Sequence, residues 1–168
     1  MSAFVERLDE LGACYDALSW WRRLWIDSVR VAWLHCERVD WMLWLLYRLD
    51  PHRYASAFDA LVDRIVDNNF LSFSAAERAE VCAGLVLLRA GGDPNLLVEE
   101  GEDEYSLTDS EAFLLALCRR YRAGYAGPAS TVFDVVLTRT PLVEQGMVVA
   151  LREVVSADEM DALWCAQT

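Results

Sequence analysis

Carboxylates at helical spacing are the residues of this chain whose types and positions could support chemistry. Asp59, Asp63 and Asp67 recur every four residues, so a helix would align them along one face. Carboxylate oxygens are the ligands that Mg²⁺ prefers, and all-α hydrolases can hold the ion between two such helices. Glu77 and Glu80 could supply the second helix. The alternative is an ordinary solvated outer face, and on that interpretation we expect no metal.

The histidines and cysteines follow no pattern typical of a reactive site. His35 is expected towards the core and His52 in the exposed first turn of a helix, and neither has a second histidine at metal-binding spacing. Cys36 adjoins His35, but neighbours on a helix point apart, so the pair does not make a nucleophile and its base. The odd number and wide spacing of the cysteines predict free, buried thiols in a cytoplasmic protein: Cys14, Cys36, Cys82, Cys118 and Cys165.

The charged residues exclude several functions. All fifteen basic residues are arginine, so lysine Schiff-base catalysis and a P-loop are ruled out. The net charge of −12 argues against direct binding of nucleic acid or of an anionic membrane, since both attract basic surfaces. It favours a basic protein partner. The acidic opening MSAFVERLDELG does not suggest a signal peptide, and the longest uncharged apolar run is too short to span a bilayer.

Six of the seven tryptophans lie between Trp20 and Trp44. Ser19 suits an N-cap, and apolar residues continue at helical spacing, so we expect one long helix from Ser19 to about Leu49. A helical wheel places one set of residues on its core face: Leu18, Leu24, Val29, Ala32, Cys36, Val39, Leu43, Leu46 and Tyr47.

The opposite face of this expected helix mixes aromatic and charged residues. Its members lie three or four positions apart and would form one ridge: Arg30, Trp33, Glu37, Trp41, Trp44 and Arg48. Tryptophan and arginine are enriched at binding hot spots, so the ridge is a candidate partner-binding surface. The alternative is a central helix that packs on both sides, with its arginines reaching outward. A membrane-surface helix is a third interpretation, which the net negative charge disfavours.

A second candidate surface is an acidic stretch without any basic residue. It lies in an expected loop, VEEGEDEYSL, whose charged members are Glu99, Glu100, Glu102, Asp103 and Glu104. The stretch could dock an arginine- or lysine-rich surface, with Tyr105 as an apolar anchor. The alternative is a solvated loop without a partner. The order of residues does not match an EF-hand calcium loop.

Capping sequences divide the rest of the chain into helices. Asp50 before Pro51 suits a helix start. Three pairs match the capping box: Ser74 with Glu77, Thr108 with Glu111, and Ser156 with Glu159. Residues 129–140 are rich in β-branched residues but would have no strand to pair with, so we expect a helix there. The sequence therefore predicts a single all-α domain over 1–168, a bundle of about six to eight helices with one long tryptophan-rich helix.

Together these patterns predict a small, acidic, cytoplasmic protein without catalytic residues or cofactor that binds and neutralises a basic partner. Toxin-immunity proteins and inhibitors of defence nucleases, of the anti-restriction or anti-CRISPR type, are proteins of this class. The ridge would supply affinity and the acidic stretch would raise the association rate. Two alternatives remain open: a metal-dependent all-α hydrolase built on the helical carboxylates, and a structural or scaffold subunit that forms a homodimer.

Overall fold

Local capping chemistry sets where several helices begin. The computed structural model describes residues 3–97, 107–121 and 141–167. At the start of one helix the Ser74 side chain accepts from the Glu77 backbone N–H at 3.3 Å, and the Glu77 carboxylate accepts from the Ser74 N–H at 2.8 Å. Thr108 and Glu111 make the same reciprocal pair, at 3.3 and 2.7 Å. These two of the three predicted capping boxes are therefore confirmed.

Asp50 forms the corner between two helices, as its position before Pro51 predicts. Its carboxylate accepts from the backbone N–H groups of His52 and Arg53, each at 3.0 Å. The third predicted capping box is only half formed. Ser156 accepts from the Glu159 N–H at 3.1 Å, but the Glu159 carboxylate instead binds the Arg53 guanidinium. The hydrogen bond to Glu159 also raises the pKa of Arg53.

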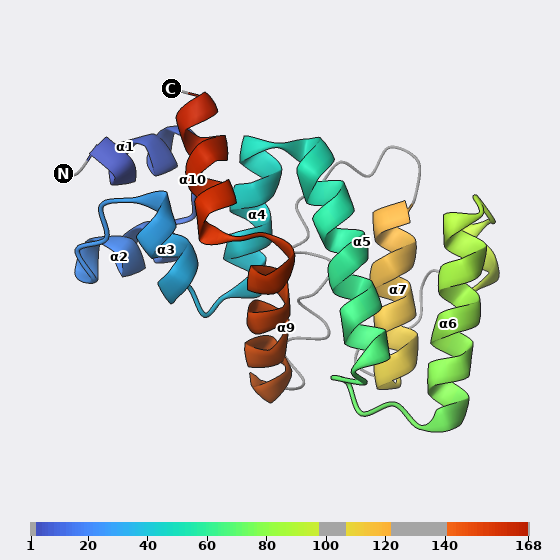
Figure 1. Ribbon diagram of the computed structural model, residues 1–168. Coiled ribbons are helices and arrows are strands. Elements are labelled where there is room, and N and C mark those ends of the chain that lie inside the picture. Colours follow the sequence, from blue (N-terminus) through green and yellow to red (C-terminus); the bar gives the residue numbers. More distant parts are fainter. Residues whose placement is uncertain (1–2, 98–106, 122–140, 168) are drawn as a thin grey trace.

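The described residues form a single helical bundle without strands, which confirms the all-α prediction (Figure 1). They hold nine α-helices, more than the six to eight expected, and one short 3₁₀ helix. The elements are α1 (Ala3–Glu10), α2 (Tyr15–Arg23), α3 (Val29–His35), α4 (Val39–Leu49), α5 (Pro51–Asp67), α6 (Ala75–Arg89), η1 (Pro94–Leu96), α7 (Asp109–Tyr121), α9 (Pro141–Val154) and α10 (Ala157–Ala166).

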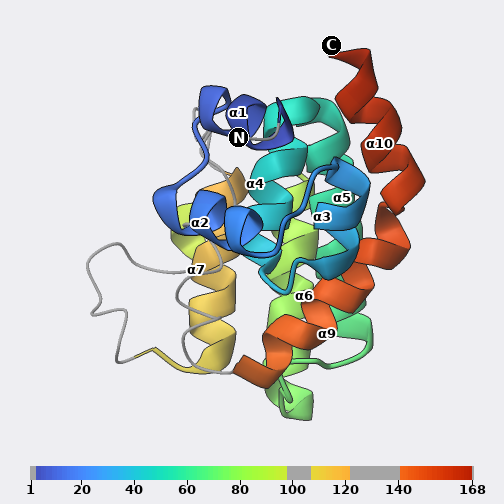
Figure 2. The same ribbon diagram turned by 90° about the vertical axis from the view of Figure 1, so that its left-hand side faces the viewer.

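The helices are arranged around α4 and α5, which pack against each other and against α9. The α6–α7 pair forms one end of the bundle, where a Cβ on Gly84 would come within 2.6 Å of the Leu114 side chain, which would have to shift to make room. At the other end α10 covers α3, and α1 packs against α2 (Figure 2). The protein therefore has an α2–α3 end and an α6–α7 end.

The prediction of one long tryptophan-rich helix from Ser19 to Leu49 is wrong. The segment forms three helices, because α2 ends at Arg23 and α3 ends at His35. Most of the predicted core face is nevertheless buried, although Leu24 is 49% exposed and Tyr47 is half-buried.

The remaining predictions about the fold concern the cysteines, two segments outside the described residues, and membrane crossing. All five cysteines are free, but only Cys36 and Cys118 are buried, so the expected burial of the other three is wrong. Residues 98–106, with the acidic stretch, and residues 129–140 lie outside the described part of the chain. In the described part, every helix is too short or too polar to cross a bilayer.

Candidate functional site

The first break in the tryptophan-rich segment is a Schellman motif at the end of α2. The Trp25 N–H donates to the Arg22 carbonyl at 3.3 Å, and the Ile26 N–H donates to the Trp21 carbonyl at 3.2 Å. This geometry requires a left-handed backbone at Trp25, whose φ is 55°. Its side chain is 91% exposed. A bulky residue therefore occupies a position that normally suits glycine, and its ring contributes almost nothing to the core.

The same motif ends three other helices, where the left-handed position carries a residue suited to it. These residues are Gly12 after α1, Asn69 after α5 and Gly91 after α6, with φ of 86°, 50° and 79°. Glycine and asparagine adopt this conformation with little penalty, whereas other residues lose about 1–2 kcal/mol. Trp25 is the exception among the four.

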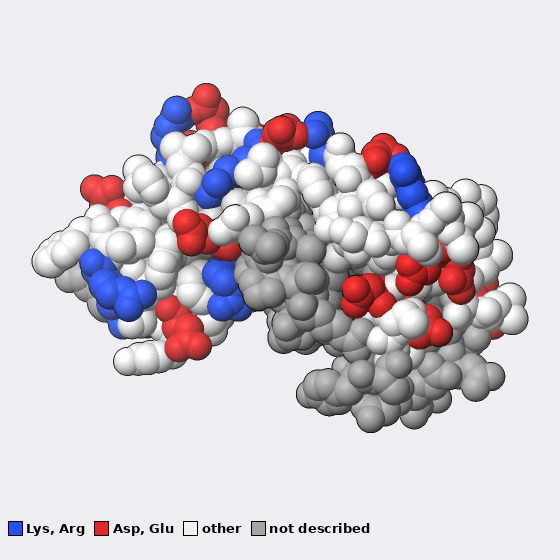
Figure 3. All heavy atoms as spheres, turned by 90° about the horizontal axis from the view of Figure 1, so that it is seen from below, with Lys and Arg blue, Asp and Glu red and all other residues white. Residues whose placement is uncertain are grey.

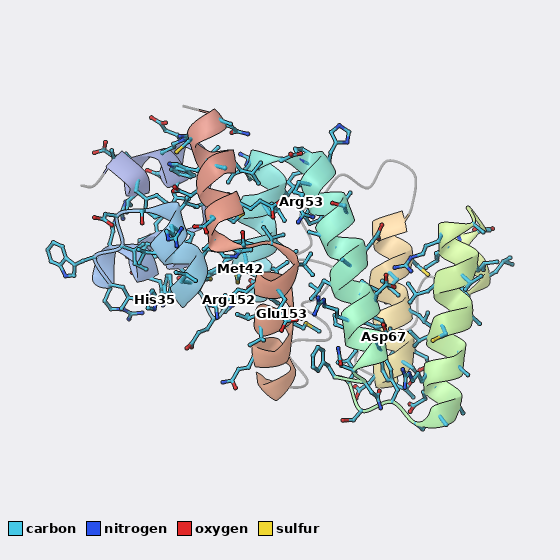
Figure 4. The ribbon with its side chains drawn as sticks, viewed as in Figure 1. His35, Met42, Arg53, Asp67, Arg152 and Glu153 are labelled. Atoms are coloured by element: carbon cyan, nitrogen blue, oxygen red, sulfur yellow. The ribbon has the colours of Figure 1, made fainter. Side chains whose placement is uncertain are left out.

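The second break, after His35, is held by α9. Ser28 caps the start of α3, accepting from the Val31 N–H at 3.3 Å. At the other end, the Arg152 guanidinium donates to the carbonyls of Trp33, at 3.1 Å, and Cys36, at 2.7 Å. Figure 4 shows Arg152 on α9 beside the end of α3. These carbonyls would have continued a longer helix, so a distant side chain stabilises the break.

The predicted ridge is not a continuous surface. Trp33 is 1% exposed, and its indole N–H donates to the Val155 carbonyl at 2.9 Å. Trp41 and Trp44 are half-buried and pack against the core. The Trp41 ring lies 5.9 Å from the Trp20 ring and 6.0 Å from the Trp21 ring. These tryptophans therefore contribute to packing, contrary to the expectation that all three face a partner.

The charged members of the ridge are also separated. Arg30 on α3 forms an ion pair with Asp158 on α10. Arg48, near the end of α4, donates through Nε to the Leu11 carbonyl at 2.7 Å. Glu37 lies between α3 and α4 and is exposed. Both arginines thus join neighbouring elements of the fold.

A groove lined by both apolar and polar side chains lies where the sequence predicts part of the core. It has a volume of about 440 Å³ and is lined by Trp20, Leu24, Ile26, Val31, His35 and Glu37. The exposed fraction of Leu34, on the same short helix as Val31, is 47%. His35 lies at the outer side of the α2–α3 end (Figure 4), so its predicted core position is wrong. We call these lining residues, together with Trp25, the aromatic groove.

The wheel missed the aromatic groove because it assumed an unbroken helix. A break between Arg23 and Val29 rotates the following side chains relative to the preceding ones, so Leu24 and Val31 face solvent. The only sequence signal available was a polar pair, Asp27 followed by Ser28, inside an apolar run. Ser28 is a residue type that favours N-caps.

The second surface is acidic and lies at the α6–α7 end. Seen from below, carboxylates gather over the ends of α5, α6 and α7, whereas both signs of charge mix at the α2–α3 end (Figure 3). The carboxylates at these helix ends and in the adjoining turns are Asp67, Glu77, Asp109 and Glu111, with Glu80 one turn further along α6; Arg78 lies among them and donates to the Asp67 carbonyl at 3.2 Å. We call these five carboxylates the acidic end. The backbone N–H of Ser74 lowers the pKa of Glu77.

Charge is divided unequally along the chain. Residues 1–48 hold seven carboxylates and six arginines, a net charge of −1. Residues 49–168 therefore carry −11 of the total −12. The acidic end comes from the strongly negative part of the chain, as does α10, which adds Asp158, Glu159 and Asp161 at the other end, whereas α2 and α3 come from the nearly neutral part.

The helical carboxylates do not assemble a metal site in the described residues. Arg89 on α6 donates to the Asp63 carboxylate at 2.8 Å and to the Asp59 carbonyl at 3.3 Å. The Asp63 carboxylate is thus paired with an arginine, and no group of three or more residues that could hold a metal ion occurs in the described parts of the chain. Asp67 lies at the end of α5 (Figure 4).

The buried thiols are poorly suited to nucleophilic chemistry. Burial raises the pKa of both Cys36 and Cys118 to about 11, so each is protonated at neutral pH. The Cys36 thiol donates to the Arg38 carbonyl at 3.4 Å. Neither thiol therefore resembles the activated, partly exposed cysteine of a catalytic site.

The described residues form an acidic helical bundle with the aromatic groove at its α2–α3 end and the acidic end at its α6–α7 end (Figure 3). No family model, curated protein or solved structure matches the chain. A functional conclusion therefore rests on the physical chemistry of these two surfaces.

Proposed function

We propose that this chain is a non-catalytic binding protein that holds a basic protein partner at its acidic end. The observation that supports this proposal is the gathering of carboxylates over the ends of α5, α6 and α7 (Figure 3), in a part of the chain, residues 49–168, whose net charge is −11. A concentrated field of one sign attracts a partner of the opposite sign and aligns it before contact. Covering the partner's basic surface would neutralise it, as immunity proteins and nuclease inhibitors do.

Stability explains some of these carboxylates, but Asp67 needs another reason. Glu77 and Asp109 lie in the first turns of α6 and α7, where the helix dipole stabilises negative charge. Asp67 is the last residue of α5, where the same dipole disfavours it, and its side chain is exposed. An acidic residue in an unfavourable position fits a surface on which negative charge itself is useful.

The acidic stretch from Glu99 to Glu104 extends this proposal. Two residues separate it from Leu107, where the described segment that leads into α7 begins. Its five carboxylates would add to the field of the acidic end. Screening limits the field to about 8 Å at physiological salt, so its effect on association should weaken strongly as salt is added.

The experiment compares two variants that change net charge equally. One neutralises the acidic end (Asp67→Asn, Glu80→Gln and Asp109→Asn). The matched control neutralises three exposed carboxylates of α1 and α2 (Glu6→Gln, Asp9→Asn and Asp16→Asn). A partner captured from the native host by the unaltered chain is identified, and its association rate is measured with all three proteins at several salt concentrations.

We expect a partner with a basic surface, and association at least tenfold slower for the acidic-end variant at low salt, with a small change in the control. The difference should shrink as salt is added. A partner without a basic surface, or equal slowing by the two triple variants, would overturn the proposal.

A further inference from the structure

Trp25 presents a large apolar ring to solvent, and its sequence neighbours Leu24 and Ile26 line a groove of about 440 Å³. We propose that a second copy of this chain covers the aromatic groove and forms a two-fold homodimer, in which Trp25 of each copy packs into the groove of the other. This interface lies at the α2–α3 end and is separate from the acidic end, so the inference goes beyond the function proposed above.

The backbone at Trp25 indicates that the ring is not retained for folding. Three Schellman motifs of the described chain carry Gly12, Asn69 or Gly91 at the left-handed position, and only the motif after α2 carries a bulky residue. The ring buries almost no area in the monomer, so nothing there offsets the unfavourable backbone conformation. Burial in an interface would offset it, because a tryptophan side chain covers about 150–250 Å².

The shape of this surface suits a contact between identical copies. A two-fold interface uses the same patch on both molecules, so that patch must contain both a projection and a hollow. The aromatic groove contains both, because Trp25 is 91% exposed and its sequence neighbours Leu24 and Ile26 line the hollow. Leu24 and Val31 leave further apolar area at the rim, exposed by 49% and 36%.

Charge favours a second copy over a basic partner at this surface. Residues 15–38 hold four arginines and three carboxylates, so α2, α3 and the segments that adjoin them lack the concentrated negative charge that would attract a basic protein. Two molecules of net charge −12 repel each other less where these nearly neutral segments meet than where their carboxylate-rich helix ends do.

The exposed turn is also complementary to itself. Arg23 and Asp27 lie two residues on either side of Trp25, and both are exposed. With a two-fold axis near Trp25, the segments that follow α2 in the two copies are antiparallel, so Arg23 of each copy faces Asp27 of the other. Opposite charges at the rim fix the register of such an interface.

The decisive variant is Trp25→Gly, because glycine suits the left-handed backbone and preserves folding. Sedimentation equilibrium of the unaltered chain, without any partner, should give twice the monomer mass of 19.1 kDa. Trp25→Gly should be monomeric, with an unchanged helical circular dichroism spectrum. The control is Tyr15→Ala, which removes another aromatic ring, 77% exposed, that does not line the groove, and it should remain dimeric.

A charge exchange tests the register. Arg23→Asp and Asp27→Arg should each raise the dimer dissociation constant at least tenfold, because each places like charges opposite one another. The double variant should restore dimerisation. A monomeric unaltered chain, a dimeric Trp25→Gly variant or a monomeric double exchange would each overturn the inference. None of these outcomes depends on a basic partner, so a failure here is distinguishable from a failure of the proposed function.

Discussion

Two substitutions of the same kind, Trp33→Ala and Trp25→Ala, separate a tryptophan that holds the fold together from one that does not. Trp33 is 1% exposed and donates to the Val155 carbonyl, whereas Trp25 is 91% exposed. Both changes remove the same atoms from the unfolded chain. Their difference in unfolding free energy therefore reports mainly on the folded state.

The expected magnitudes follow from burial and hydrogen bonding. Replacing a buried tryptophan with alanine destabilises a protein by about 3–5 kcal/mol, and the Val155 carbonyl would lose its partner as well. The total free energy of unfolding of a small domain is about 5–15 kcal/mol, so the Trp33→Ala variant should be barely stable at ambient temperature. Trp33→Phe keeps most of the ring but removes the indole N–H that donates to Val155, and it should lower the free energy of unfolding by about 1–3 kcal/mol. Trp25→Ala should change stability by less than about 0.5 kcal/mol.

Urea unfolding followed by circular dichroism provides the measurement. It should be carried out at low protein concentration, where association contributes little to the midpoint. A shift in midpoint at constant slope gives the stability change. If Trp33→Ala and Trp25→Ala lower the free energy of unfolding by similar amounts, burial does not distinguish the two rings. The structural assignment of the aromatic groove is then wrong.

Three further predictions concern titration and packing. In the native protein a thiol reagent should modify the three exposed cysteines quickly and reach Cys36 and Cys118 only on unfolding; five fast thiols would contradict the burial that raises both pKa values. The pKa of Glu77 is lower in the folded state than its ordinary 4.5, so its stabilising contribution is present above pH 4.5 and disappears as the pH falls through the folded value. The stability difference between the unaltered chain and Glu77→Gln should therefore narrow in acid, and a constant difference would refute this. Trp41→Ala should destabilise the fold by about 2 kcal/mol in urea unfolding, because the ring is half-buried among other indoles; no change would show that it is free of the core.

The parts of the fold that local chemistry determines could be predicted from the sequence. Asp50, Ser74 and Thr108 cap their helices through partners two or three residues away, so short motifs suffice to place these starts. The box at Ser156 was only half predictable, because Glu159 binds Arg53, which is 106 residues distant in the chain.

The breaks in the tryptophan-rich segment could not be predicted in the same way. The first lacks the glycine that normally marks a left-handed helix end, since Trp25 stands there. The second depends on Arg152, which lies 116 residues from its acceptor Cys36. Each break changes the direction in which later side chains point, so an error in helix length became an error in which residues face solvent. This is why Trp33 was assigned to a surface and Leu24 to the core.

The positions of the aromatic groove and the acidic end have a consequence for valency. A two-fold assembly joined at α2 and α3 would carry its two acidic ends at opposite extremities, because α6 and α7 lie at the far side of each bundle (Figure 1). Such an assembly could bind two basic molecules at once, or one molecule with two separated basic regions. In the second case the attachment of one region raises the effective concentration of the other, and retention exceeds what either contact alone provides.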